Sequence, residues 1–247
     1  MPAAKGSVAS NPDVSAALLR VASALADNKT MLGRRYGDWC TGAPLLESAV
    51  AAAAMAQDEL GHARALYPLV DQLSHGANTA SIQEPGWQQF PTHALAALDR
   101  PLGGWVEFVA VNFVIDTALT MLCEAASEGA NQGLAQRARK ILQEEQTHWI
   151  HARGWIRRLS RDAVTAPQIS AAVARLWPEA MALFGPDEGS DLEVLKSAAE
   201  LVAGSSQLRE RLGDRLSAVL LESGLAVPGP APIDWSRWSS QTSRLEP

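Results

Sequence analysis

The sequence predicts an all-α protein whose core is a bundle of long helices. Alanine and leucine are frequent, while aromatic residues make up only 6% of the 247 residues. Alanine and straight-chain residues lose little conformational freedom in a helix, so this composition favours helices over strands. Apolar residues recur at helical spacing along most of the chain, and no segment shows the alternation expected of a strand.

Start and stop signals place four core helices. Pro44 suits the first turn of a helix, and Asn131 is a predicted N-cap. Apolar residues at helical spacing between such signals predict four helices, over 13–39, 44–74, 104–129 and 131–160. Residues 13–160 are therefore the predicted core bundle.

The remaining segments are a long connection, additional C-terminal helices and a tail. Glycine and proline are frequent over 75–103, where only a short helix near 93–99 is expected, so this connection is predicted to cross over the bundle. Residues 166–223 are predicted to hold the additional helices, at 166–184, 191–203 and 206–223. The tail, 224–247, is expected to be extended and docked by Trp235 and Trp238.

Length, charge and cysteine content limit the class of protein. The chain can bury one large core, and residues 1–247 are predicted to form a single domain. A net charge of -6 and a pI near 5.4 argue against nucleic acid as a partner. Two cysteines are too few for a disulfide framework. No signal peptide is evident, and Asp116 interrupts the best candidate for a membrane span, so we expect a cytoplasmic protein with no membrane partner.

One motif occurs twice, once in the second predicted helix and once in the fourth. Glu59 precedes His62 by three residues, and Glu145 precedes His148 by the same spacing. This spacing places the carboxylate and the imidazole one turn apart on the same face, and both faces are the apolar ones. Asp116 is a third acid on an apolar stripe, in the third helix. A charged side chain in a core must be paired or bound to a metal.

These five residues make a candidate metal site. Two Glu-x-x-His pairs on partner helices, each with a further acid about 30 residues earlier, are the ligand set of a carboxylate-bridged di-iron bundle. Carboxylates and imidazoles suit iron, in a mononuclear or dinuclear site, or manganese. The predicted metal ligands are Glu59, His62, Asp116, Glu145 and His148. The alternative is that each motif is a buried pair whose charges are satisfied without a metal.

Several segments resemble the phenylacetic acid catabolic family, the ferritin-like subunits of bacterial phenylacetyl-CoA epoxygenase. The similarity covers about residues 14–185 and includes LGRRYGDW at 32–39, APLLE at 43–47, QDELGHARAL at 57–66, EEQTHWIHA at 144–152 and RLWP at 175–178. It implies a ferritin-like four-helix bundle and an oxygenase component that acts on an acyl-CoA or small aromatic substrate. The family has a catalytic di-iron subunit and a shorter partner that has lost the ligands. This chain resembles the partner in length and the catalyst in its two motifs.

The chain departs from the catalytic pattern at two positions. Counting 29 residues back from Glu145 gives Asp116, so that acid is kept in a shorter form. Counting 30 residues back from Glu59 gives Lys29, where the resemblance implies glutamate. Three carboxylates and one ammonium carry a net charge of about -2, enough for one divalent ion rather than two. A metal-free site held by Lys29 is one possibility, and an outward-facing Lys29 that leaves an open coordination position is the other.

Other residues near the motifs have candidate roles. Tyr36 lies two turns after Lys29 on the same face and is a candidate radical or hydrogen-bonding residue, with a core tyrosine as the alternative. Lys29 and Tyr36 are therefore the candidate catalytic residues. Asp58 and Glu144, each preceding a motif acid, are candidates to orient the imidazoles.

Two functions remain open from the sequence. The first is a non-haem iron oxygenase that receives electrons from a reductase, as the resemblance implies. The second is a non-catalytic partner subunit whose polar core is free of metal. Ferritin-like metal storage is less favoured, because nothing suggests a shell-forming chain. In each case we expect a homodimer, or a heterodimer with a related ferritin-like subunit.

Overall fold

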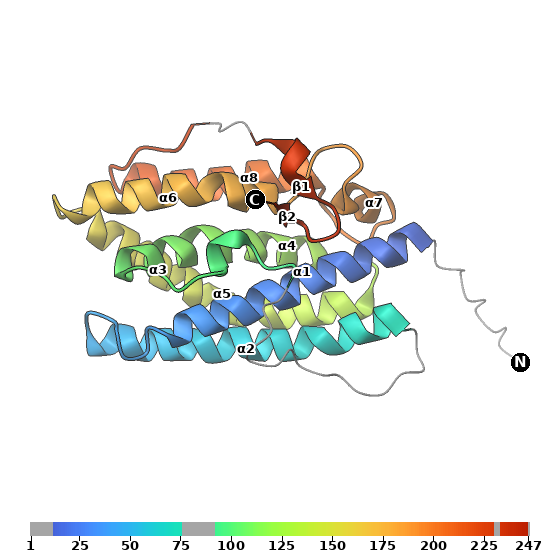
Figure 1. Ribbon diagram of the computed structural model, residues 1–247, viewed down its shortest axis with the longest axis horizontal. Helices are drawn as coiled ribbons and strands as arrows, with labels where there is room; N and C mark the ends of the chain where they lie inside the picture. The colour runs from blue at the N-terminus through green and yellow to red at the C-terminus, as the bar shows by residue number, and fades with distance from the viewer. Residues whose placement is uncertain (1–11, 76–91, 230–232, 247) are drawn as a thin grey trace, which may run out of the picture.

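The computed structural model describes residues 12–75, 92–229 and 233–246, and it is built almost entirely from helices (Figure 1). The all-α class is confirmed. The core elements are α1 (Pro12–Gly37), α2 (Leu46–His75), α3 (Trp105–Val111), η2 (Asn112–Asp116), α4 (Thr117–Ser127) and α5 (Gln132–Leu159). Residues 1–11, and residues 76–91 of the predicted crossover, lie outside the described residues.

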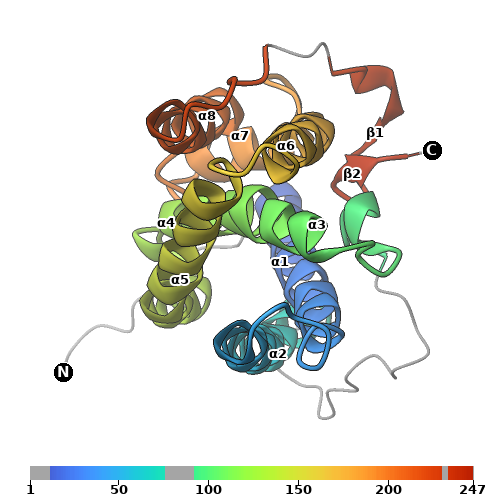
Figure 2. The ribbon, with the colours of Figure 1, turned by 90° about the vertical axis from the view of Figure 1, so that its left-hand side faces the viewer.

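The core helices form two antiparallel pairs. α1 packs against α2, α4 packs against α5, and α2 also contacts α5 (Figures 1 and 2). α3 begins at the end of the bundle where α2 begins, so α2 and the α3–α4 segment run in the same direction. This is the arrangement that a crossover connection produces in a ferritin-like bundle.

The third core helix is interrupted where the sequence predicts a continuous one. Between α3 and α4, η2 is a π-helical turn, and all five of its residues are buried. A π-turn widens the helix locally and occurs mostly at functional sites. It places Asn112 and Asp116 together on the inner side of the helix, where their side chains are hydrogen-bonded at 3.2 Å.

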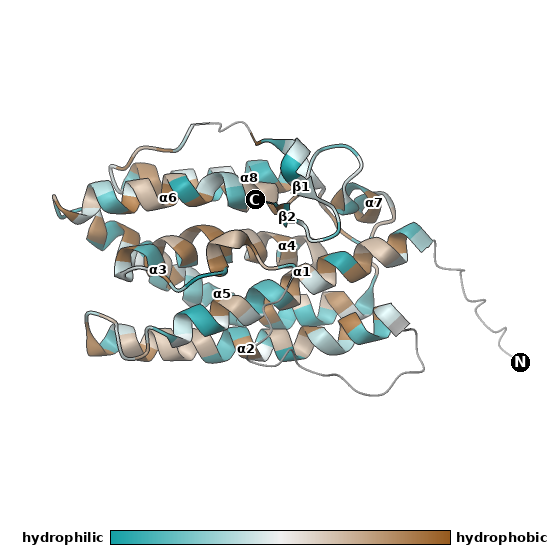
Figure 3. Cartoon of the chain, in the orientation of Figure 1, coloured by the Kyte–Doolittle hydropathy of each residue, from teal (hydrophilic) through white to brown (hydrophobic). Residues whose placement is uncertain are grey.

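The segment Trp105–Ser127 is more apolar than the interruption at Asp116 suggests. Its mean hydropathy of 1.7 and its 23 residues satisfy the length and composition of a membrane span, although Asp116 lies within it. Within this segment, 83% of the 18-residue window that passes the test is buried inside the protein, as expected of a core helix. In Figure 3, α3 and α4 carry mainly hydrophobic residues, while the outer helices carry a mixture of hydrophobic and hydrophilic residues.

Three further helices cover the side of the bundle that faces away from α2 (Figures 1 and 2). They are α6 (Thr165–Ala182), α7 (Asp191–Ser197) and α8 (Ser205–Glu222). The predicted helix over 191–203 is wrong in its second half. α7 ends early because Ala199 has a positive φ of 58°, a left-handed conformation that a helix cannot continue through.

The tail also differs from the prediction of no strands. After η3 (Trp235–Arg237), the strands β1 (Trp238–Ser239) and β2 (Arg244–Leu245) form a small antiparallel hairpin. Trp238 donates a hydrogen bond from Nε1 to the carbonyl of Ala182 at 2.9 Å. Arg244 reaches the carbonyl of Ala94 at 2.9 Å, beside η1 (Ala96–Leu98). The tail thus ties α6 to the segment that leads into α3.

The close approach of α1 and α2 depends on Gly33, one turn after Lys29. A Cβ atom at Gly33 would lie 2.7 Å from Leu60 Cγ and 3.2 Å from the carbonyl oxygen of Ala56. Gly61, also inside a helix, has nothing within 4 Å of its Cβ position.

Gly33→Ala is therefore expected to lower the free energy of unfolding by about 1–3 kcal/mol, because the Leu60 side chain and the Ala56 carbonyl must both shift. Gly61→Ala should raise it by about 0.5–1 kcal/mol through helix propensity alone. Urea denaturation of both variants measures these changes. A stabilised Gly33→Ala protein would show that this helix contact is looser than described.

Candidate metal centre with a lysine at its middle

Five charged side chains from four helical segments meet in the middle of the bundle. None is more than 3% exposed, and their neighbours are the apolar core residues of α1, α2, α4 and α5. The cluster consists of Lys29 on α1, Glu59 on α2, Asp116 on η2, and Glu145 and His148 on α5. The repeated motifs thus face the core, as their helical spacing predicts.

Lys29 lies at the centre of this cluster. Its Nζ donates to Glu59 Oε1 at 3.1 Å, to Asp116 Oδ1 at 2.8 Å and to Glu145 Oε1 at 2.5 Å. An ammonium has three N–H groups, so each carboxylate receives one. The side chain is fully buried, and the alternative of an outward-facing Lys29 is not what the structure shows. The three carboxylates together hold the pKa of Lys29 well above its ordinary value despite burial.

His148 supplies a second positive charge. Its Nδ1 lies 3.0 Å from Asp116 Oδ2, and its Nε2 lies 3.4 Å from Asp58 Oδ2. Burial lowers the pKa of His148, but hydrogen bonds to Asp116 and Glu59 outweigh burial and raise the pKa to about 11. In the metal-free cluster the imidazole is therefore protonated at neutral pH.

His62 lies at the edge of the cluster. Its Nε2 is 2.6 Å from Glu144 Oε2, while its Nδ1 is 3.5 Å from both Glu59 and Glu145. This Nδ1 is buried and makes no hydrogen bond within the described part of the chain. The acid before each motif thus contacts the histidine of the other motif: Glu144 contacts His62, and Asp58 contacts His148.

The acids respond differently to this environment. Burial raises the pKa of Asp116, but Lys29 and His148 outweigh burial and hold the pKa well below its ordinary value. Glu145 has its pKa raised to about 7, first by burial and then by the negative charge of Asp116, and Lys29 only partly offsets this. The three carboxylates carry three negative charges, and Lys29 and His148 carry two positive ones. One negative charge is left, and protonation of Glu145 neutralises it.

Neutral side chains donate further hydrogen bonds to the carboxylates. Tyr36 donates from its hydroxyl to Asp116 Oδ2 at 3.2 Å and is fully buried. Burial, and then the charge of Asp116, raises the pKa of Tyr36 well above its ordinary value, so the phenol keeps its proton. Thr120 donates to Glu145 Oε2 at 3.0 Å. The sequence did not lead us to predict the hydrogen bonds of Asn112 and Thr120 to these carboxylates, although each residue lies four positions from Asp116 on the same face.

A second buried polar group, also missed, anchors the end of the crossover to α1. Asp27 Oδ2 accepts from the backbone N–H of His93 at 3.0 Å, and Asp27 Oδ1 accepts from Tyr67 at 2.9 Å. Asn28 accepts from the N–H of Leu95 at 2.9 Å. These contacts position the residues that enter α3 and give His93 a structural role.

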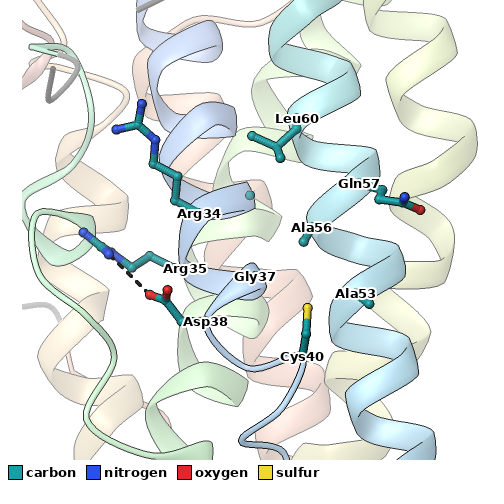
Figure 4. Close-up of a pocket in the computed structure, with 10 residues that line it drawn as sticks. Arg34, Arg35, Gly37, Asp38, Cys40, Ala53, Ala56, Gln57 and Leu60 are labelled. Atoms are coloured by element: carbon teal, nitrogen blue, oxygen red, sulfur yellow. Dashed lines mark hydrogen bonds and ion pairs between the residues drawn. The ribbon is translucent and has the colours of Figure 1, made fainter. Parts of the chain in front are cut away.

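A separate cavity of about 650 Å³ lies between α1 and α2 (Figure 4). Figure 4 shows Arg34 and Arg35 on its α1 side and Ala56 and Gln57 on its α2 side. Arg35 donates to the carbonyl of Leu98 at 2.9 Å. This arginine holds the segment before α3 against α1.

The cluster has some of the features of a metal site. Donor atoms of Glu59, Asp116, Glu145 and His148 lie within 4.8 Å of one another, and they are of types that bind iron or manganese. Lys29 Nζ, however, contacts all three carboxylates and occupies the space between them. These residues do not fit a pair of irons while Lys29 holds this position.

A bundle of two antiparallel helix pairs with a Glu-x-x-His motif in each pair defines a ferritin-like protein. More narrowly, the chain belongs to the phenylacetic acid catabolic protein family, whose model matches residues 1–242. The resemblance found in the sequence is thereby confirmed. The chain is 28% identical over 206 residues to the C component of the 1,2-phenylacetyl-CoA epoxidase of Escherichia coli (strain K12), covering 83% of this chain and 81% of that protein.

The cluster predicts an unusual dependence of stability on pH. His148, with its pKa raised from 6.5 to about 11, contributes stability that is present below pH 6.5 and is lost as pH rises toward 11. Glu145, raised from 4.5 to about 7, contributes stability below pH 4.5 that is lost by about pH 7. Asp116, with a lowered pKa, contributes stability above pH 3.8 that is lost as pH falls below it.

The free energy of unfolding should therefore decline steadily as pH is raised from about 5 to about 10. His148→Gln should flatten the decline above pH 6.5, while His93→Gln, on the second polar group, should leave it in place. Urea denaturation across this range measures the slope. A free energy of unfolding that stays constant or rises between pH 7 and pH 10 would contradict the protonated state assigned to His148.

Proposed function

We propose that the chain is a cytoplasmic, non-catalytic component of an oxygenase of the phenylacetyl-CoA epoxidase type, with a metal-free polar core. The observation that carries this proposal is the position of Lys29, whose ammonium contacts three carboxylates at 2.5–3.1 Å. Similarity to one component of a multi-subunit epoxidase supports the placement in such an oxygenase and in phenylacetate catabolism.

The charge of the cluster favours a metal-free core. A di-iron bundle uses four carboxylates and two neutral imidazoles. This chain offers three carboxylates in the cluster, and Lys29 takes the place of the fourth. A fixed ammonium within 3.1 Å of every carboxylate repels divalent ions and already neutralises part of the charge that would attract them.

Within this proposal the residues of the cluster have structural roles. Lys29 ties α1 to α2, η2 and α5 through its three ion pairs. Tyr36 and Asn112 donate to the same oxygen of Asp116 and fix its orientation. A related ferritin-like subunit would carry the iron, receive electrons from a reductase and hold the acyl-CoA or aromatic substrate.

A second candidate function, a metal-dependent oxygenase, is favoured by two observations. Four donor atoms lie within 4.8 Å of one another, and His62 Nδ1 is buried beside them without a hydrogen bond in the described structure. Iron bound there would activate dioxygen. This function requires Lys29 to leave the cluster and His148 to lose its proton.

Replacing Lys29 distinguishes the two candidates. Lys29→Glu restores four carboxylates, so we expect iron to rise from well below one per chain toward about two after anaerobic loading with ferrous iron. Lys140→Glu, the same change at an exposed lysine, should leave the iron content unchanged. Plasma mass spectrometry measures the stoichiometry. An unmodified chain that binds as much iron as Lys29→Glu would overturn the proposal.

Removing the charge of Lys29 should destabilise the fold. Lys29→Met keeps most of the volume but leaves three buried carboxylates without their ammonium, so the free energy of unfolding should fall by about 3–5 kcal/mol. Lys140→Met, at the exposed position, should change it by less than about 0.5 kcal/mol. Denaturation in urea measures both. Equal effects of the two substitutions would show that the ion pairs of Lys29 contribute little.

Activity provides the direct test of the role. The chain alone, loaded with iron and supplied with a reductase and phenylacetyl-CoA, should consume no dioxygen above background. In complex with a di-iron ferritin-like subunit, Tyr36→Phe should leave turnover within about twofold, because the phenol only orients Asp116. A loss of about 100-fold or more in that complex, roughly 2.7 kcal/mol of transition-state stabilisation, would assign Tyr36 a catalytic role and support the second candidate.

A further inference from the structure

The cavity between α1 and α2 has the dimensions of a small-molecule site. Its volume of about 650 Å³ lies within the range of about 300–1,000 Å³ that such sites occupy. It is lined from Gly33 to Cys40 at the end of α1 and from Ala53 to Leu60 on α2 (Figure 4). Seven residues of a helix rise about 10 Å, which is the length of a single-ring or short aliphatic molecule.

The apolar part of this cavity is formed by small residues that face each other. Gly33 and Gly37 line it from α1, and Ala53 and Ala56 line it from α2. A Cβ atom at Gly37 would meet no side chain and no neighbouring helix within 4 Å, so the space beside it is open. The five residues of the buried charged cluster, all of them described, do not line the cavity, so it is a separate site.

The charged residues that line the cavity leave a net positive charge. They are Arg34, Arg35 and Asp38, which sum to +1. Arginine in the last turn of a helix is favourable because of the helix dipole, and that benefit does not need burial. The Arg35 side chain, however, is only 9% exposed. A buried guanidinium needs acceptors for its N–H groups.

Two of the five N–H groups of the Arg35 guanidinium have an acceptor among the described residues. Nε donates to the carbonyl of Leu98 at 2.9 Å. Nη1 lies 3.4 Å from Asp38 Oδ2, which is long for a hydrogen bond between charged groups, and the Asp38 side chain is 52% exposed. The described part of the chain offers no acceptor to the other N–H groups. Arg35 is therefore a buried cation whose charge is only partly compensated.

The donors and the walls of the cavity together select the ligand. A guanidinium forms two parallel hydrogen bonds with a carboxylate or a phosphate. A carboxylate carries one negative charge and matches the net charge of the lining, whereas a phosphate monoester carries about -1.5 to -2 at pH 7. The two arginines disfavour a cationic ligand. The glycine and alanine walls require an apolar body.

We propose that this cavity binds a small monocarboxylate with an aromatic or short aliphatic body. The carboxylate pairs with Arg35 in place of Asp38, and the apolar body lies between Gly37 and the alanines of α2. The bound acid thereby links α1 to α2. The site is formed whether or not the charged cluster binds a metal, so the inference does not rest on the proposed function.

Calorimetric titration of the iron-free full chain with benzoate and with hexanoate tests this inference. We expect saturable binding of both acids at one site per chain. Benzamide, the neutral analogue of benzoate, should bind at least about tenfold more weakly, because it cannot form the charge-assisted pair with Arg35. Phenyl phosphate should also bind more weakly than benzoate.

The thiol of Cys40 provides an independent readout. It lines the cavity and is partly exposed, whereas Cys123 is fully buried. Saturating benzoate should slow the alkylation of Cys40 by iodoacetamide about fivefold or more, because the bound acid blocks access to the thiol. Benzamide at the same concentration should have little effect. Cys40→Ser identifies the signal, since it should remove the fast phase of alkylation.

Substitutions of the two paired charged residues should act in opposite directions. Arg35→Gln should weaken benzoate binding at least about tenfold, because the bidentate partner is lost. Arg161→Gln, at an exposed arginine that does not line the cavity, should change the affinity less than about twofold. Asp38→Asn should strengthen binding about threefold or more, because the competing carboxylate is removed.

Gly37→Leu tests the cavity without changing Arg35, whose contact with Leu98 also supports the fold. Because Gly37 faces open space, the leucine should fill the cavity and weaken benzoate binding at least about tenfold. Gly61→Leu is the matched control, since Gly61 is also an exposed helical glycine beside open space but does not line the cavity, and it should leave the affinity within about twofold. Circular dichroism confirms that each variant is folded.

Each of four results would overturn the inference. The first is the absence of saturable binding of either acid by the unmodified chain. The second is equal binding of benzamide and benzoate. The third is a folded Gly37→Leu protein that binds benzoate as the unmodified chain does, which would place the acid elsewhere. The fourth is tighter binding of phenyl phosphate than of benzoate, which would make a phosphate monoester the ligand. The iron content of the unmodified chain tests the proposed function separately, so either can fail alone.

Discussion

The ammonium of Lys29 is the constraint on which the rest of the structure depends. Burying three carboxylates in a helical core is costly unless each has a partner of opposite charge or a strong donor. One side chain from α1 supplies that partner to α2, η2 and α5 at once, through contacts of 2.5–3.1 Å. The three ion pairs of this lysine thus link α1 to the other three segments.

The neighbouring residues follow from this arrangement. Three carboxylates against one ammonium leave two excess negative charges, and a protonated His148 between Asp116 and Asp58 offsets one of them. His62 contacts Glu144. The π-turn at 112–116 brings Asn112 to Asp116, and Asn112 in turn fixes the ring of His151. The buried cluster is therefore connected to His151 by a chain of hydrogen bonds.

Much of the cluster could be predicted from spacing, because side chains three residues apart on a helix must share a face. That argument located Glu59, Glu145 and their histidines, and counting back along the chain located Lys29 and Asp116. The π-turn could not be predicted, since no glycine or proline marks it. The early end of α7 depends on a positive φ at Ala199, a residue that carries no turn signal, and β1 and β2 have two residues each, too few to show alternation.

The most direct test is a crystal structure of the unmodified chain after anaerobic soaking in ferrous iron, with anomalous data collected at the iron edge. We expect continuous density for the Lys29 side chain ending between Glu59, Asp116 and Glu145, with no anomalous peak there. Two anomalous peaks bridged by these carboxylates, with Lys29 turned toward solvent, would contradict it.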